Sequence, residues 1–246
     1  MNCPKCGHEQ SDENMECIRC GLIFSQYKPL DYNQILDRQS SSENAPLFKR
    51  TIKYLIRTKD KTEIVYFAGR LFVLVLLIVW SVKFFQSSIA DNYTGKSFMH
   101  LVNLPFHEAG HLVFLPFGKV LHSLGGSLGQ VIMPLVCALV LLVRTRDTFG
   151  ASIAFWWAGE SILDLAPYID DARSMTLQLL GGNTGSSAPY GFHDWNFVLS
   201  ELNLLRYDHL LADIAFTGGR LIMSFALLWG LAVLIRQATR LKKFPS

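Results

Sequence analysis

Charged residues are scarce in this chain. Asp, Glu, Lys and Arg make up 17% of its 246 residues, whereas an average soluble domain contains about 25%. The shortage falls on the part after residue 65, where long apolar blocks alternate with short polar turns. This pattern excludes an ordinary soluble protein as a description of the whole chain and is typical of a membrane-embedded one.

Two further features are missing. The N-terminus has no basic segment followed by an apolar stretch, so we see no cleavable signal peptide and expect the first residues to stay in the cytoplasm. Cysteine is almost absent after residue 20, because four of the five cysteines lie at positions 3, 6, 17 and 20. In a reducing compartment, paired cysteines at such spacing favour a metal ion over disulfides.

The four cysteines form two copies of one Cys-x-x-Cys-Gly turn. Cys3 and Cys6 make the first copy, and Cys17 and Cys20 make the second. Each turn directs two thiolates at one point, so the two turns together predict a closed, structural Zn²⁺ site. Two disulfides or four unrelated thiols are the alternatives. The module, residues 1–27, resembles the short zinc ribbons at the ends of many bacterial proteins. A protein partner of this module is therefore one hypothesis.

Residues 28–65 connect the ribbon to the apolar blocks. Residues 28–48 read as a polar linker, and residues 49–65 as a basic, partly amphipathic helix on the membrane surface. Lys and Arg gather in Lys49–Lys61 and again in Arg236–Lys243. Anchoring to the lipid bilayer explains both clusters with fewer assumptions than nucleic acid, which we do not expect as a partner.

The sequence of residues 66–246 predicts an all-α membrane domain with four or five embedded helices. We expect this domain to lie in a bacterial inner membrane. The apolar blocks are Phe67–Phe85, Phe98–Leu121, Leu128–Val143, Phe149–Ile169 and Leu211–Ile235. Five crossings from a cytoplasmic N-terminus would leave the basic C-terminus outside, against the positive-inside rule. We expect the second block to re-enter, because Pro105 and Pro116 leave about 11 helical residues, or about 16 Å.

The second block contains the motif His107-Glu108-Ala109-Gly110-His111. Residues four apart share one face of a helix, so His107 and His111 can hold one zinc ion. Glu108 is then placed to act as a general base toward water at the metal. We expect Asn103 to cap this helix and Pro105 to begin it. The alternative is that the three polar groups only form hydrogen bonds between helices.

A catalytic zinc site needs a third protein ligand. The His-Glu-x-x-His motif is followed by a later helix end that contains Pro167 and several Asp residues. Together the two motifs resemble the site-2 protease type of intramembrane metalloprotease. The second motif of that family runs Asn-x-x-Pro and then Leu-Asp-Gly. The resemblance implies Asp171 as the third ligand and Asp164 as a nearby polar helper. This chain departs from the family in Asp164, in a shorter spacing after the proline, and in Ala172 where the family has Gly.

Other residues stay open as the third ligand. Glu160 begins a Glu-x-x-x-Asp pattern that resembles the third-ligand helix of thermolysin-like enzymes, and Asp164 and His193 are further candidates. His193 and Asp194 can also orient a ligand or contact substrate, or His193 can be a loop histidine with Asp194 capping the next helix. The chain from His107 to Asn196 is also similar to a group of bacterial membrane proteins with the same membrane core, a likeness that names no substrate.

The motif and the resemblance together predict a zinc-dependent peptidase that hydrolyses peptide bonds in or near the bilayer. Its substrate would be a membrane protein or a peptide, and the chain would hold one structural and one catalytic Zn²⁺ ion. The alternative function is a catalytically inactive membrane protein that binds zinc as a sensor, chaperone or scaffold. Glu108 separates the two hypotheses, because hydrolysis needs this carboxylate and metal binding does not.

Overall fold

The structure is a computed structural model that describes residues 1–26, 46–56, 63–178, 182–187 and 193–241. The chain divides into two compact units, Met1–Thr51 and Ile52–Ser246. Most of the predicted linker, residues 28–48, lies outside the described residues.

The N-terminal unit contains two copies of one turn, as the repeated cysteine motif predicts. The backbone N–H of Gly7 donates to the carbonyl of Cys3 at 2.9 Å, and that of Gly21 donates to the carbonyl of Cys17 at 2.8 Å. Both glycines have a positive φ, 72° and 66°, a conformation that strains other residues. After the second turn comes the short helix η1 (Phe24–Gln26).

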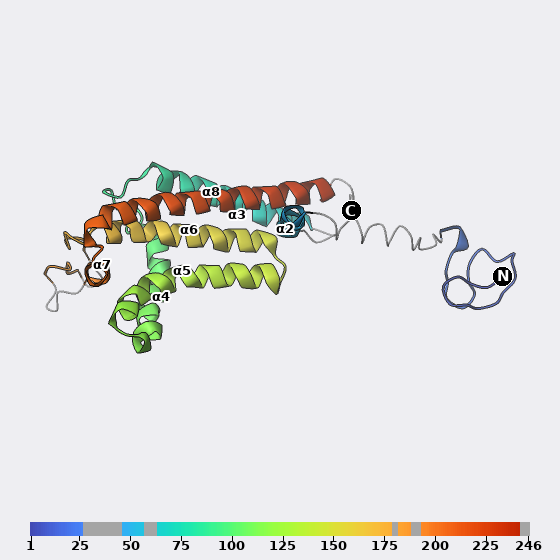
Figure 1. The fold of residues 1–246 in the computed structure, drawn as a ribbon. Helices are drawn as coiled ribbons and strands as arrows, with labels where there is room; N and C mark the ends of the chain where they lie inside the picture. The colour runs from blue at the N-terminus through green and yellow to red at the C-terminus, as the bar shows by residue number, and fades with distance from the viewer. Residues whose placement is uncertain (27–45, 57–62, 179–181, 188–192, 242–246) are drawn as a thin grey trace. The chain divides into compact units, whose positions relative to one another are not determined.

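The rest of the described chain is helical (Figure 1). Its helices are α2 (Leu47–Leu55), α3 (Ile64–Gln86), α4 (Phe98–Phe114), η2 (Leu115–Phe117), α5 (Lys119–Val143), α6 (Thr148–Asp170), α7 (Asp194–Glu201), η3 (Leu205–Tyr207) and α8 (Asp208–Leu241). The all-helical expectation is therefore confirmed for the membrane domain.

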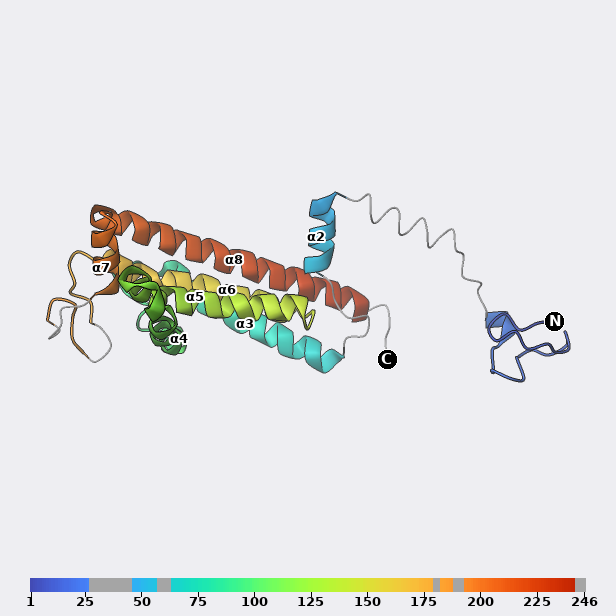
Figure 2. The ribbon, with the colours of Figure 1, turned by 60° about the horizontal axis from the view of Figure 1, so that its bottom comes forward.

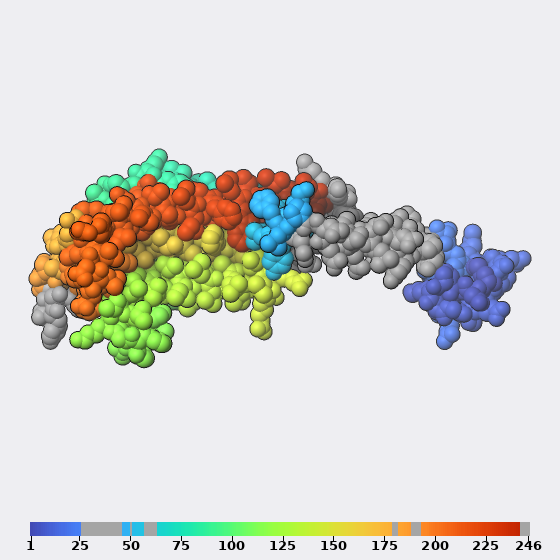
Figure 3. Space-filling view, viewed as in Figure 1, coloured from blue at the N-terminus to red at the C-terminus, as the bar shows by residue number. Residues whose placement is uncertain are grey.

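Helix α6 lies at the centre of this unit. It packs against α8, α5 and α4, while α3 packs against α8. Figures 1 and 2 show α3, α5, α6 and α8 side by side, with α4 crossing one end of α5. In Figure 3, α8 covers much of α6, which shows as a strip between α8 and α5. Phe84, Trp156, Leu163 and Met223 form the core where α3, α6 and α8 meet.

Three helical segments among the described residues are long and apolar enough to cross a membrane: Ile64–Gln86, Lys119–Val143 and Leu205–Leu241. Helix α6 is not one of them. It carries three carboxylates, and most of its side chains are buried by neighbouring helices. Helix α4 has 17 residues, which reach only about 26 Å. Helices that could cross a membrane are therefore present among the described residues, and the predicted total of four or five embedded helices stays a prediction.

The start of α4 differs from the expectation. The helix begins at Phe98, and Ser97 caps it by accepting from the backbone N–H of His100. Pro105 lies inside the helix, and Asn103 is buried there and does not cap it. The His-Glu-x-x-His motif is therefore in the third and fourth turns. The sequence suggested a later start because a Pro two residues after an Asn is a common helix start signal.

Helices α4 and α5 cross with their backbones in contact. A Cβ atom added to Gly110 of α4 would lie 2.1 Å from the carbonyl oxygen of Gly125, and one added to Gly129 would lie 2.3 Å from that of Phe106. The expected block Leu128–Val143 starts later than the helix, because α5 begins at Lys119 and includes Gly125 and Gly126. Gly125 serves close packing, since an added Cβ would lie 2.7 Å from the carbonyl oxygen of Gly110.

Candidate metal centres

The four ribbon cysteines converge. The Sγ atoms of Cys3 and Cys20 lie 3.7 Å apart, as do those of Cys6 and Cys17, and all four lie within 4.8 Å of one another. Four sulfur atoms around one zinc ion lie about 3.8 Å apart, whereas a disulfide holds its sulfurs at about 2.05 Å. Against the effect of burial, hydrogen bonds from the backbone N–H groups of Cys6 and Lys5 lower the pKa of Cys3, whereas burial and the neighbouring sulfurs raise the pKa of Cys20. The arrangement fits a metal ion.

A second group of three ligand atoms lies in the membrane unit. His107 and His111 come from α4, and Asp194 is the first residue of α7. The Oδ2 atom of Asp194 lies 3.9 Å from His107 Nε2 and 3.5 Å from His111 Nε2. One ligand atom from each residue lies within 4.8 Å of the other two. Two imidazoles and one carboxylate are a ligand set used by catalytic zinc sites.

Hydrogen bonds orient both imidazoles so that Nε2 faces this point. The amide of Gln130 donates through Nε2 to the carbonyl of Ser161 at 3.0 Å, so its Oε1 must face His107. His107 therefore donates from Nδ1, and its Nε2 keeps a free lone pair. His111 likewise donates from Nδ1 to the carbonyl of His122 at 2.8 Å. Metal-binding histidines are commonly held by such second hydrogen bonds.

Gly126 of α5 makes room for the two nitrogen atoms. A Cβ atom at this position would lie 2.4 Å from His107 Nε2 and 2.5 Å from His111 Nε2. A side chain there would collide with both nitrogen atoms and displace the imidazoles. The residues present therefore fit a metal ion, and the glycine is part of that fit.

Asp194 is held by the packing of α7. The hydroxyl of Tyr168 donates to Asp194 Oδ2 at 3.0 Å, and the backbone N–H of Asp194 donates back to that hydroxyl at 3.1 Å. Trp195 donates to Ser127 of α5 at 3.1 Å. His193 caps α7, because its Nδ1 accepts from a backbone N–H of the first turn. Helices α5 and α6 thus place the carboxylate opposite α4.

The structure does not bring Asp171 to the imidazoles, which corrects the expectation for the third ligand. Its oxygens accept from the hydroxyls of Ser174 and Thr176 and from the backbone N–H of Leu177. Burial opposes the Asp171 carboxylate, but these bonds outweigh it and lower its pKa. The Nε2 atom of His193 lies 3.4 Å from Asp171 Oδ2. Asp171 therefore holds the chain that leads to Asp194.

The two other acidic candidates take part in a separate polar cluster. Asn103 donates to Glu160 at 3.0 Å and to Asp164 at 3.1 Å, and Asp164 also lies 3.0 Å from His100 Nδ1. Trp157 donates to the Asn103 carbonyl oxygen at 2.8 Å, which fixes the orientation of the amide. Glu160 is fully buried, and its Oε1 has no partner among the described residues. The predicted helper Asp164 is thus near the site without joining the three ligand atoms.

The candidate metal centre of α4 and α7 lines a cavity of about 430 Å³. Glu108 lines it beside His107 and His111, as the sequence predicts, and Asp164 and Tyr168 form part of its opposite wall. A substrate that enters this cavity reaches the ligand atoms and Glu108 together. Sequence reasoning did not include Asp194 among the candidate metal ligands, although it had singled out the pair His193-Asp194 before a short helix.

Comparison of the chain with protein-family models, curated proteins and solved structures gives no match. The resemblance to site-2 proteases therefore rests on the motifs around His107 and Pro167 alone. The geometry agrees with a metal site at the first motif and departs from the family pattern at the second.

Proposed function

We propose that this protein is a zinc-dependent peptidase of the bacterial inner membrane, with its zinc ribbon in the cytoplasm. The observation that carries the proposal is the convergence of His107 Nε2, His111 Nε2 and Asp194 Oδ2 beside Glu108 in one cavity. A helix that serves only to pack would not need two imidazoles with free lone pairs and a carboxylate aimed at one point.

The residues of the site divide the work of hydrolysis. Zinc, when bound, is a Lewis acid toward a carbonyl oxygen and makes water more acidic. Glu108 is not one of the three converging ligands, so its carboxylate is available to take a proton from the attacking water and pass it to the leaving amine. Gln130 and Tyr168 keep the ligands in place. The cavity admits a peptide segment of a membrane protein or a free peptide.

The ribbon has a different role in this proposal. Four thiolates leave no open position on a tetrahedral ion, so a metal there stabilises the fold of the ribbon. The exposed side chains of Met15 and Ile18 lie on this small unit and suit contact with a protein partner.

Zinc content and cleavage, measured on the same variants, test the proposal. We expect two zinc ions in the purified wild type and in Glu108→Gln, and one in His107→Ala. New N-termini mapped in membrane proteins of cells that express the wild type should be absent with both variants. Glu108→Asp, which keeps a carboxylate on a shorter side chain, is the matched control and should retain partial cleavage.

Two outcomes would contradict the proposal. If the wild type binds a single zinc ion that is lost only with the ribbon cysteines, the proposed reaction has no metal cofactor. If cleavage is unchanged in Glu108→Gln, Glu108 is not the general base. Two zinc ions without cleavage in any variant would favour the inactive zinc-binding sensor, chaperone or scaffold.

A further inference from the structure

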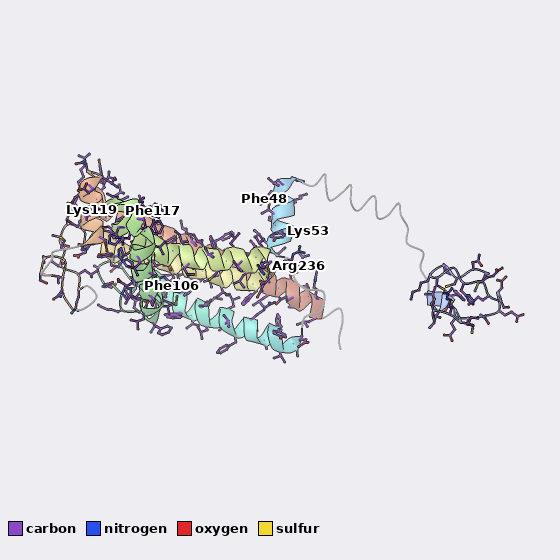
Figure 4. All side chains as sticks on the ribbon, turned by 90° about the horizontal axis from the view of Figure 1, so that it is seen from below. Phe48, Lys53, Phe106, Phe117, Lys119 and Arg236 are labelled. Atoms are coloured by element: carbon purple, nitrogen blue, oxygen red, sulfur yellow. The ribbon has the colours of Figure 1, made fainter. Side chains whose placement is uncertain are left out.

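The two ends of the helical bundle differ in charge. Helices α3 and α6 begin at one end, and α5 and α8 end there (Figures 1 and 2). We call it the basic end, and it is defined by Arg70, Arg144, Arg146, Arg236 and Arg240. Figure 4 shows Lys53 and Arg236 at this end and Phe106, Phe117 and Lys119 at the other.

Helix α2 is attached at the basic end. The hydroxyl of Tyr54 donates to the carbonyl of Leu142 at 3.0 Å, and Trp229 donates to the carbonyl of Leu55 at 2.8 Å. Leu142 precedes the last residue of α5, and Trp229 lies in the second half of α8. The chain therefore enters the bundle at the end where the arginines gather.

Residue counts over the described segments of this unit show the difference. Residues 52–56, 63–70, 144–147 and 236–241, at the basic end, contain 6 Lys and Arg against 2 Asp and Glu. Residues 87–97, 115–122, 171–178, 182–187 and 193–210, at the other end, contain 4 Lys and Arg against 5 Asp and Glu. Loops rich in Lys and Arg stay on the cytoplasmic side of a membrane. The basic end is thus the cytoplasmic one.

The cavity lies at the opposite end. Its lining comes from Asn92 and Gly95 before α4, from α4 itself, from the first half of α5, from the end of α6, and from Gln178 and Asp194. On α5 the lining extends from His122, 22 residues before Arg144, to Gln130, 14 residues before it, which correspond to about 33 and about 21 Å. On α6, Tyr168 is 21 residues after Asp147, or about 32 Å. The cavity thus extends from the far surface of a hydrocarbon core of about 30 Å part of the way into it.

We infer that the cavity opens on the extracytoplasmic face of the membrane. A consequence follows for the substrate, and it rests on the proposed peptidase function. The substrate is a peptide segment of a secreted or membrane protein that emerges on the extracytoplasmic face. Cytoplasmic proteins are excluded as substrates, and the metal ion at His107 and His111 exchanges with the extracytoplasmic solution.

Labelling of single cysteines in intact spheroplasts tests the inference. In a Cys137→Ala background, Gln178→Cys places a thiol at the cavity rim and Arg146→Cys places one at the basic end; both native side chains are exposed. We expect a membrane-impermeant maleimide to label Gln178→Cys in intact spheroplasts. Arg146→Cys should react at least tenfold more after permeabilisation than before it. The parent Cys137→Ala chain measures the background of the ribbon cysteines.

The reverse pattern, or equal labelling of both positions in intact spheroplasts, would overturn the inference. The test needs no catalysis, so it fails separately from the proposed function. If the labelling is as expected but no zinc is bound at His107, the inferred orientation stands and the proposed peptidase function is wrong. If zinc content and cleavage are as expected but the labelling is reversed, the proposed peptidase function stands and its substrates lie in the cytoplasm.

Discussion

Tyr168 and Asp194 are joined by two hydrogen bonds that run in opposite directions. The tyrosine hydroxyl donates to the carboxylate oxygen that faces the imidazoles, and it accepts from the backbone N–H of the same aspartate. One hydroxyl thus fixes both the position of the chain and the orientation of the carboxylate. This relationship makes Tyr168 a positioning residue for the metal centre.

Replacement of Tyr168 by Phe removes both bonds and keeps the ring, which lies 4.3 Å from the ring of His193. We expect zinc affinity at the membrane site to fall about 10-fold to 100-fold, as for other groups that orient metal ligands. A competition titration with a zinc chelator measures the change. Tyr207→Phe removes a hydroxyl from η3, outside the cavity, and should leave the affinity unchanged. Equal affinity in Tyr168→Phe would show that the packing of α7 alone holds Asp194.

Replacement of Gly126 by Ala places a methyl group in collision with both Nε2 atoms and should displace the imidazoles. Because that carbon would lie 2.4 Å from His107 Nε2, we expect zinc content to fall from two ions per chain to one. Gly218→Ala is the matched control, since an added Cβ there meets no atom within 4 Å. Two ions per chain in Gly126→Ala would mean that the imidazoles bind metal from another direction.

Asp194 and Asp171 should respond differently to replacement by Asn. Asp194→Asn removes a charged ligand, so we expect the membrane zinc to be lost. Asp171→Asn replaces one of the two oxygens that accept from Thr176 and Leu177 by an amide donor and should lower the free energy of unfolding by about 1–3 kcal/mol, with zinc retained. Metal analysis and thermal unfolding of both variants measure this. If the membrane zinc is lost only in Asp171→Asn, Asp171 is the third ligand, as the site-2 protease resemblance implies.

Asp171 also predicts a dependence of stability on pH. Burial opposes its charge, but hydrogen bonds from Ser174, Leu177 and Thr176 hold its pKa below the ordinary value of 3.8. A carboxyl whose pKa is lowered by folding stabilises the folded state above the ordinary pKa, and the contribution is lost as the pH falls through the lowered pKa. The difference in melting temperature between wild type and Asp171→Asn should therefore shrink in acid. A difference that grows in acid would contradict this assignment.

The ribbon should lose its zinc independently of the membrane site. Replacement of Cys6 by Ser removes one of four thiolates, and a module this small depends on its metal for folding. We expect one zinc ion per chain and proteolytic cleavage within residues 1–26, with the membrane zinc retained. Cys137→Ser, outside both groups, should keep two ions. Loss of both ions in Cys6→Ser would show that the two centres are coupled.

The long helices could be predicted because they depend on local composition. The blocks Phe67–Phe85, Phe149–Ile169 and Leu211–Ile235 correspond to α3, α6 and α8 with bounds shifted by a few residues. Apolar runs of this length have few alternatives to a helix in a membrane. The ribbon could be predicted for a similar reason, since two Cys-x-x-Cys turns set their own ligand geometry.

The approach of Asp194 to the two imidazoles could not be predicted in this way, because it depends on where a loop returns. Asp171 follows Pro167 closely in sequence, and that proximity favoured it. The chain instead continues beyond Asp171 and comes back with Asp194 at the first turn of α7. Asn103 failed as a helix cap for the same kind of reason: its amide is needed between two buried carboxylates on α6, a contact that no local pattern reveals.

The backbone contact of α4 with α5 has a consequence for how a substrate reaches the site. Gly110 and Gly129 leave no gap between the two helices at the level of the imidazoles. A transmembrane segment cannot slide sideways from the lipid through this seam without forcing the helices apart. In the proposed reaction, a polypeptide therefore reaches Glu108 by another route than this seam, and the exposed lining residue Gln178 lies on one such route.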